Sequence, residues 1–197
     1  MPHPRDWPAR NRRYALAAAG FLLLLYGTLG VTPRAVGALS GWLGASRLYT
    51  LVVLVLLGAL AMVLWQRRAV LLPPRRDVWA ALLWLGGCYA LSFLTVQSPA
   101  TGLHLLFYGV LAWLVTEALR GMVPAARLHG RVLLVALPAG LVDEGIQWLL
   151  PNRHGVAEDV HLNWNAALLA LVLMRVLGDD GTGPAGTDTD APGAGGR

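Results

Sequence analysis

Long apolar stretches, each of about 17–19 residues, constrain this chain more than any other feature of its sequence. Six of them cover residues 14–31, 48–65, 78–96, 103–119, 132–150 and 160–177. A helix that rises 1.5 Å per residue needs roughly 20 apolar residues to cross a hydrocarbon core of about 30 Å. None of the stretches alternates apolar and polar residues as a barrel strand does, and all are rich in Leu, Val and Ala. The sequence therefore predicts an all-α integral membrane protein, a polytopic bundle of about six transmembrane helices.

The composition excludes several other classes of protein. Apolar residues make up 56% and charged residues 14% of the chain, against about 45–50% and about 25% in soluble globular proteins. The mean hydropathy is +0.54, which excludes intrinsic disorder for most of the chain. The basic excess comes from arginine alone, in short clusters between apolar stretches, so a nucleic-acid partner is not expected. Cys88 is the single cysteine, which excludes a disulfide framework and a thiolate metal cluster.

The arginines also predict the orientation of the chain. Eleven lie in the N-terminal segment and in the second and fourth loops, against three in the first, third and fifth loops. Because cytoplasmic loops carry the excess of basic residues, both termini are expected in the cytoplasm. We expect a cytoplasmic tail over residues 1–13, a retained first helix, three N-terminal transmembrane helices over 14–96, and a disordered cytoplasmic tail over 178–197. Glu117 and Arg120 are expected to form a surface pair at the inner end.

Polar residues in the last three stretches form the strongest functional signal, because charged groups in hydrocarbon are costly and need a partner or a role. Each stretch has a pair spaced three or four residues apart, which places the pair on one helix face. With the predicted topology, all three pairs lie near the outer membrane surface, and an arginine follows in the connecting loop. The candidate residues are His104 and Tyr108, Glu144 and Gln147, Arg153, and Asp159 and Asn163. Asp143 adjoins Glu144 but points about 100° away around the helix, so its role is left open.

The segment LVDEGIQWLLPNRHGVAEDVHLNWNAA, with LHLLFYGVLAWL upstream, resembles the VanZ-like family. The family pattern has a Glu-x-x-Gln pair, an Arg beyond a short turn, an Asp and an Asn four residues later, and an upstream His-x-x-x-Tyr element. The resemblance covers residues 98–177, a VanZ-like three-helix region. The sequence departs from the family at Ala100 and Thr101, where Asp-Lys is common, and at Ala166, where Gly is usual.

The resemblance implies a small multi-pass protein of the bacterial plasma membrane, related to an accessory factor in resistance to the glycopeptide teicoplanin. It implies no established reaction. Its expected partners are membrane lipids and, as a ligand, an antibiotic, a cell-wall precursor or a lipid headgroup, with Arg153 contacting an anionic group. The oligomeric state stays open.

Two alternatives to ligand binding stay open. One is a membrane enzyme that acts on a lipid-linked substrate, with His104 or Glu144 as general base and Arg153 clamping phosphate. The other is a structural clamp, in which Glu144, Arg153 and Asp159 form an ion-pair network between two helices. His104 would then form a hydrogen bond with a carboxylate of the bundle. A metal site could be built from His104, Glu144 and Asp159, with His154 or His161 as a further ligand. No compact two-histidine spacing supports one, so neither metal nor cofactor is expected.

Overall fold

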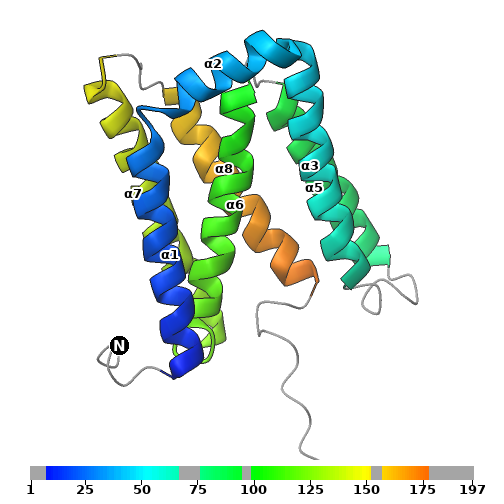
Figure 1. Ribbon diagram of the computed structural model, residues 1–197. Helices are drawn as coiled ribbons and strands as arrows, with labels where there is room; N and C mark the ends of the chain where they lie inside the picture. Colours follow the sequence, from blue (N-terminus) through cyan, green and yellow to red (C-terminus); the bar gives the residue numbers. More distant parts are fainter. Residues whose placement is uncertain (1–7, 67–75, 95–98, 152–156, 178–197) are drawn as a thin grey trace, which may run out of the picture.

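The computed structural model describes residues 8–66, 76–94, 99–151 and 157–177, and it is helical throughout (Figure 1). Helices make up 91% of these described residues, and no strand occurs among them. The described residues form seven helices: α1 (Ala9–Thr28), α2 (Thr32–Leu43), α3 (Ala45–Gln66), α5 (Arg76–Leu94), α6 (Pro99–Leu119), α7 (Ala125–Leu149) and α8 (Ala157–Val176). The prediction of an all-α fold is confirmed.

Each predicted apolar stretch corresponds to one helix, but some helices begin earlier than their apolar part. α1 begins at Ala9 and includes residues that we expected in a tail, and α7 begins at Ala125, several residues before its predicted start at 132. Leu, Ala and Arg are all good helix formers, so the helix continues past the apolar boundary in both cases. The predicted tail over 178–197 lies outside the described residues.

A further helix, α2, lies where a loop was expected. It bends by 70° from α1 and runs across one end of the bundle toward α3 (Figure 1). Pro33 lies at its start, a position where proline is preorganised for a helix and its missing N–H is no loss. Gly44 follows its end with φ +87°, a conformation that glycine adopts without strain.

Three helical segments are long and apolar enough to cross a membrane: Ala45–Met62, Gly102–Leu119 and Ala125–Leu149. The bent pair α1 and α2 would supply a fourth if it forms one span. Large apolar side chains also lie on the outside of the bundle, with Leu23 74%, Leu83 75% and Leu149 76% exposed. These features indicate a helical membrane protein. They do not establish the six spans that the sequence predicts. α8 carries acidic residues in its first turn and Arg175 in its last, and the apolar part of α5 is short, Trp79–Cys88.

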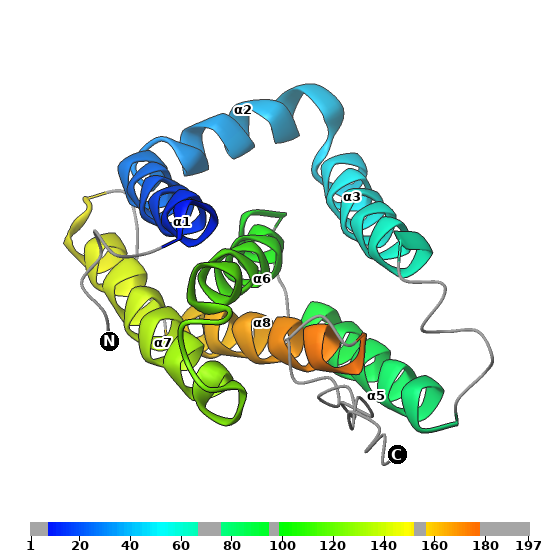
Figure 2. The ribbon, with the colours of Figure 1, turned by 90° about the horizontal axis from the view of Figure 1, so that it is seen from below.

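α6 is the central helix of the bundle, with α1, α7 and α8 packed around it and α3 and α5 to one side (Figure 2). The core between these helices combines one large aromatic residue with many small ones. Its fully buried members include Tyr108, Leu111, Ala112, Val132, Ala136, Ala166 and Ala167. Small residues allow helix backbones to approach closely, which is how membrane helices gain packing energy.

α7 and α8 approach each other closely around Gly140. A Cβ atom at Gly140 would lie 3.1 Å from Cβ of Asn163. One turn away, Nε1 of Trp164 donates a hydrogen bond to the carbonyl of Leu137 at 3.0 Å. Pro138 lies between these two contacts, inside α7. Residues 137–140 therefore determine how α8 packs against α7. This segment lies about one turn before the polar residues of α7.

Candidate functional site

Six polar side chains from α6, α7 and α8 meet inside the bundle, and we call them the His104 cluster. They come from the beginning of α6, the end of α7 and the beginning of α8, which lie at the same end of the molecule (Figure 1). None is more than 7% exposed. The members are His104 and Tyr108 of α6, Asp143, Glu144 and Gln147 of α7, and Asn163 of α8.

Hydrogen bonds within the cluster hold the two adjacent carboxylates. The hydroxyl of Tyr108 donates to Oδ2 of Asp143 at 3.0 Å and is 3.2 Å from the carbonyl of Ala139. Nε2 of Gln147 donates to Oε1 of Glu144 at 2.8 Å and to Oδ1 of Asp143 at 3.3 Å. The single amide of Gln147 thus ties together two carboxylates that leave α7 in different directions.

His104 contacts Asn163 across the interface between α6 and α8. Its Nδ1 lies 2.7 Å from Oδ1 of Asn163, and its ring stacks on that of Tyr108 with centroids 6.5 Å apart. An amide oxygen only accepts, so Nδ1 carries the proton and the neutral imidazole keeps its lone pair on Nε2. No described residue accepts a hydrogen bond from Nδ2 of Asn163, which is fully buried.

α1 also contacts the part of α7 that carries the cluster. The hydroxyl of Tyr26 donates to the carbonyl of Ala139 at 2.8 Å, the same carbonyl that Tyr108 approaches from α6. A carbonyl oxygen has two lone pairs, so it can accept the bond from Tyr26 and also lie beside the Tyr108 hydroxyl, whose one proton is donated to Asp143. Residue 139 is therefore held by two other helices, one turn before Asp143.

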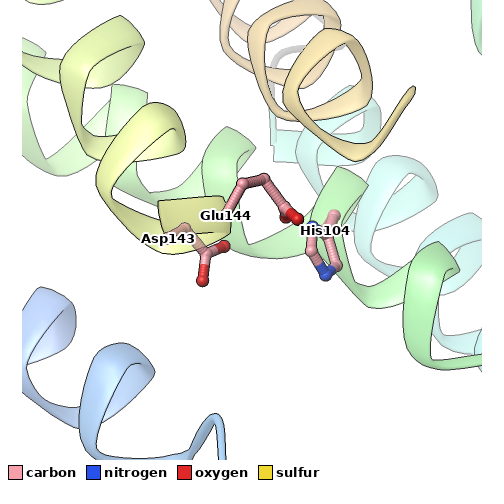
Figure 3. Close-up of side chains that lie close together, drawn as sticks. All are labelled: His104, Asp143 and Glu144. Carbon is pink, nitrogen blue, oxygen red and sulfur yellow. The ribbon is translucent and has the colours of Figure 1, made fainter. Parts of the chain in front are cut away.

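Three groups of the cluster come close enough to share one ion. One imidazole nitrogen of His104 and one carboxylate oxygen each of Asp143 and Glu144 lie within 4.8 Å of one another. Figure 3 shows the Glu144 side chain reaching from α7 toward the imidazole on α6, with the Asp143 carboxylate beside it. The set can hold a cation or accept hydrogen bonds from a ligand.

The structure brings together five of the seven residues that the sequence singled out: His104, Tyr108, Glu144, Gln147 and Asn163. The other two are a half-buried Asp159 in the first turn of α8 and Arg153, which lies outside the described residues. The convergence of the three helix ends, which we inferred from the predicted topology, is present. The partner of His104 is the amide of Asn163 rather than a carboxylate.

Asp143 is the residue whose place the sequence left open, and it lies at the centre of the cluster with 1% of its surface exposed. Its spacing of four residues from Gln147 is a signal that could have included it, because such residues share a helix face. Gln147 lies between the faces of Asp143 and Glu144 and contacts both.

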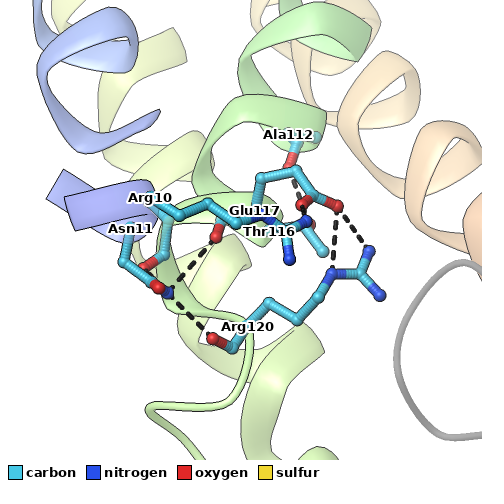
Figure 4. Close-up of polar contacts among 7 residues, drawn as sticks. Arg10, Asn11, Ala112, Thr116, Glu117 and Arg120 are labelled. Carbon is cyan, nitrogen blue, oxygen red and sulfur yellow. Dashed lines mark hydrogen bonds and ion pairs between the residues drawn. The ribbon is translucent and has the colours of Figure 1, made fainter. Parts of the chain in front are cut away.

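A second polar group, at the opposite end of the bundle, corrects another prediction. Glu117 and Arg120 do form an ion pair, at 2.6 Å, but Glu117 is only 5% exposed, so it is not a surface pair. Arg10 of α1 also binds the Glu117 carboxylate (Figure 4). Nδ2 of Asn11 donates to the carbonyls of Ala118 at 2.9 Å and Arg120 at 2.8 Å, which would otherwise be unsatisfied at the end of α6.

Comparison with models of known protein families, with curated protein sequences and with solved structures finds no match to this chain.

Proposed function

We propose that the chain is a VanZ-like protein of the bacterial plasma membrane, and that it alters susceptibility to glycopeptide antibiotics by binding a polar envelope ligand at the His104 cluster. The ligand would be the antibiotic, a cell-wall precursor or a lipid headgroup. The family pattern at His104, Tyr108, Glu144, Gln147 and Asn163 supports the proposal, because these five side chains meet in one place.

The burial of Asp143 and Glu144 is the observation that carries the functional part of the proposal. Acidic residues within membrane-spanning helices are rare because burying them is costly, so they indicate function by default. Asp143 is 1% and Glu144 6% exposed. Replacement of buried charged groups by apolar residues of similar volume is often neutral or stabilising. The stability of the bundle therefore does not explain two adjacent buried carboxylates.

The distribution of arginine supports an outward-facing cluster. Arg12 and Arg13 lie at the start of α1, Arg120 follows the end of α6, and Arg127 and Arg131 lie in the first turns of α7. These segments are at the end opposite to the cluster (Figure 1). By the positive-inside bias, the arginine-rich end faces the cytoplasm and the cluster faces the cell envelope, where glycopeptides and their targets are found.

The experiment expresses the chain and its variants in a glycopeptide-sensitive Gram-positive host. It measures the minimal inhibitory concentration of teicoplanin together with the amount of folded protein in the membrane. We expect the parent chain to raise the inhibitory concentration, and Glu144→Gln and His104→Gln to lose this effect while keeping their membrane level. Glu158→Gln and His161→Gln are the matched controls, because both residues are exposed on α8, and both variants should protect like the parent.

Two results would contradict the proposal. If the parent chain leaves the inhibitory concentration unchanged at a normal membrane level, the role in glycopeptide susceptibility is wrong. If the cluster variants protect as well as the controls do, the protective effect does not depend on the cluster, and its residues serve only to hold the helices together.

A further inference from the structure

We infer that His104, Asp143 and Glu144 form a binding site for one divalent transition-metal ion. This inference goes beyond the proposed function and does not depend on it, since the ion can be measured directly on the purified protein. The site combines one residue of α6 with two of α7, so it requires that the two helices pack as they do in the structure.

The distances between the three ligand groups suit a single ion. Their donor atoms lie within 4.8 Å of one another. Some point therefore lies within about 2.8 Å of all three atoms, against about 2.0–2.2 Å for bonds from zinc to His nitrogen or carboxylate oxygen. Rotamer adjustments of less than an ångström by the two carboxylates would close that gap.

The surroundings of Asp143 also favour a cation. At the other end of the bundle, the buried Glu117 has two guanidinium groups beside it, from Arg10 and Arg120. Among the residues that the structure describes, no basic side chain forms an ion pair with Asp143, whose contacts are the hydroxyl of Tyr108 and the amide of Gln147. A divalent ion would supply the positive charge that a buried carboxylate requires.

Two contacts around the ligands resemble the outer shell of known metal sites in their chemistry. Metal-binding histidines almost always donate their other ring N–H to an oxygen, which fixes the tautomer, and Oδ1 of Asn163 lies 2.7 Å from Nδ1 of His104 in that role. The carboxylate of Asp143 is in turn held by Tyr108 and Gln147.

The amide of Asn163 is an independent indication that a ligand oxygen binds beside His104. Nδ2 of Asn163 is buried with no described acceptor, and such orphaned donors are rare in native structures. An oxygen that completes the coordination of the ion beside His104 would supply the acceptor.

The donor set selects the class of ion. Imidazole favours zinc and its neighbours over magnesium and calcium, and two carboxylates are compatible with Zn²⁺, Co²⁺ or Mn²⁺. Three protein ligands leave a coordination position for water or a substrate group, as in catalytic rather than structural zinc sites. Cys88 lies on α5 and is not part of the set, so no thiolate contributes.

The test uses the full chain, purified in detergent with a tag free of histidine, stripped with a chelator and titrated with ZnCl₂ by calorimetry. We expect one Zn²⁺ per chain. Replacement of Zn²⁺ by Co²⁺ in the parent chain should give visible d–d absorption without the intense thiolate-to-metal band. Such a spectrum indicates nitrogen and oxygen ligands. Because it is measured on the parent chain, it does not depend on the folding of any variant. The variants His104→Gln, Asp143→Asn and Glu144→Gln should each bind Zn²⁺ at least about tenfold more weakly, as expected when a ligand is removed.

The exposed residues of α8 again provide controls, and His161→Gln and Glu158→Gln should bind Zn²⁺ like the parent. The inference is overturned if the folded parent binds no stoichiometric Zn²⁺ or Co²⁺. It is also overturned if His161→Gln removes binding while His104→Gln keeps it. Because no step of the titration involves an antibiotic, a chain that binds Zn²⁺ but gives no protection would refute the proposed function alone.

Discussion

A methyl group added at Gly140 would test how closely α7 and α8 must approach for the site to form. In Gly140→Ala the new Cβ would lie 3.1 Å from Cβ of Asn163 and 3.4 Å from Cδ1 and Nε1 of Trp164. A Cβ atom is fixed to its backbone and cannot rotate away, so α8 itself must move outward by a few tenths of an ångström. Asn163, the partner of His104, would move with it.

The magnitude follows from comparing this change with the same change at Gly145. Both glycines lie inside α7, and a Cβ at Gly145 would meet nothing within 4 Å. Each substitution gains about 0.5–1 kcal/mol from the better helix propensity of alanine. Only Gly140→Ala also carries a cost of overpacking, about 1–3 kcal/mol. The shared gain cancels in the comparison, so the two variants should differ in free energy of unfolding by about 1–3 kcal/mol, with Gly140→Ala the less stable.

Unfolding in mixed micelles, titrated with sodium dodecyl sulfate and followed by far-UV circular dichroism, measures this difference. We expect the transition of Gly145→Ala at or above that of the parent chain and the transition of Gly140→Ala below it. If Gly140→Ala is as stable as Gly145→Ala, α7 and α8 do not pack at van der Waals contact here, and the geometry of the site derived from that packing is wrong.

Two further changes test hydrogen bonds that hold the bundle at its two ends, in the same unfolding assay. Asn11→Ala removes the amide that binds two carbonyls at the end of α6 and should cost about 1–3 kcal/mol, whereas Asn165→Ala, at an exposed position of α8, should be nearly neutral; equal effects would contradict the capping role. Tyr108→Phe removes the hydroxyl that donates to the buried Asp143 and should cost about 1–3 kcal/mol, more than Tyr26→Phe, whose hydroxyl donates to a neutral carbonyl. The reverse order would show that Asp143 does not depend on Tyr108.

The features that the sequence predicted are those that depend on local pattern. The length of an apolar stretch places a helix, and spacings of three and four residues place polar groups on a common face. The meeting of the ends of α6, α7 and α8 required one more step, the alternation of direction between successive helices. Each of these features can be predicted without knowing which face each helix turns toward its neighbours.

What the sequence did not predict depends on packing between distant segments. Asp143 enters the cluster because α6 brings Tyr108 to that side of α7, and no local pattern determines that rotation. Glu117 is buried because α1 continues back to Ala9 and carries Arg10 to it, over residues that resemble a polar tail. α2 is too short to span a membrane, so a search for long apolar stretches does not find it.

The segment 137–140 of α7 connects the packing of the bundle to the chemistry of the cluster. Its backbone is contacted by α1 through Tyr26, by α6 through Tyr108 and by α8 through Trp164. The acidic pair follows within one to two turns, so the position of both carboxylates depends on contacts that none of the proposed ligands would touch. A proline in a helix interior removes a backbone hydrogen bond and weakens the helix locally, and here Pro138 is surrounded by contacts from three other helices. The cluster is therefore held by a part of α7 that three other helices contact, which is the arrangement that a preorganised ion site needs, since small displacements of its ligands weaken binding.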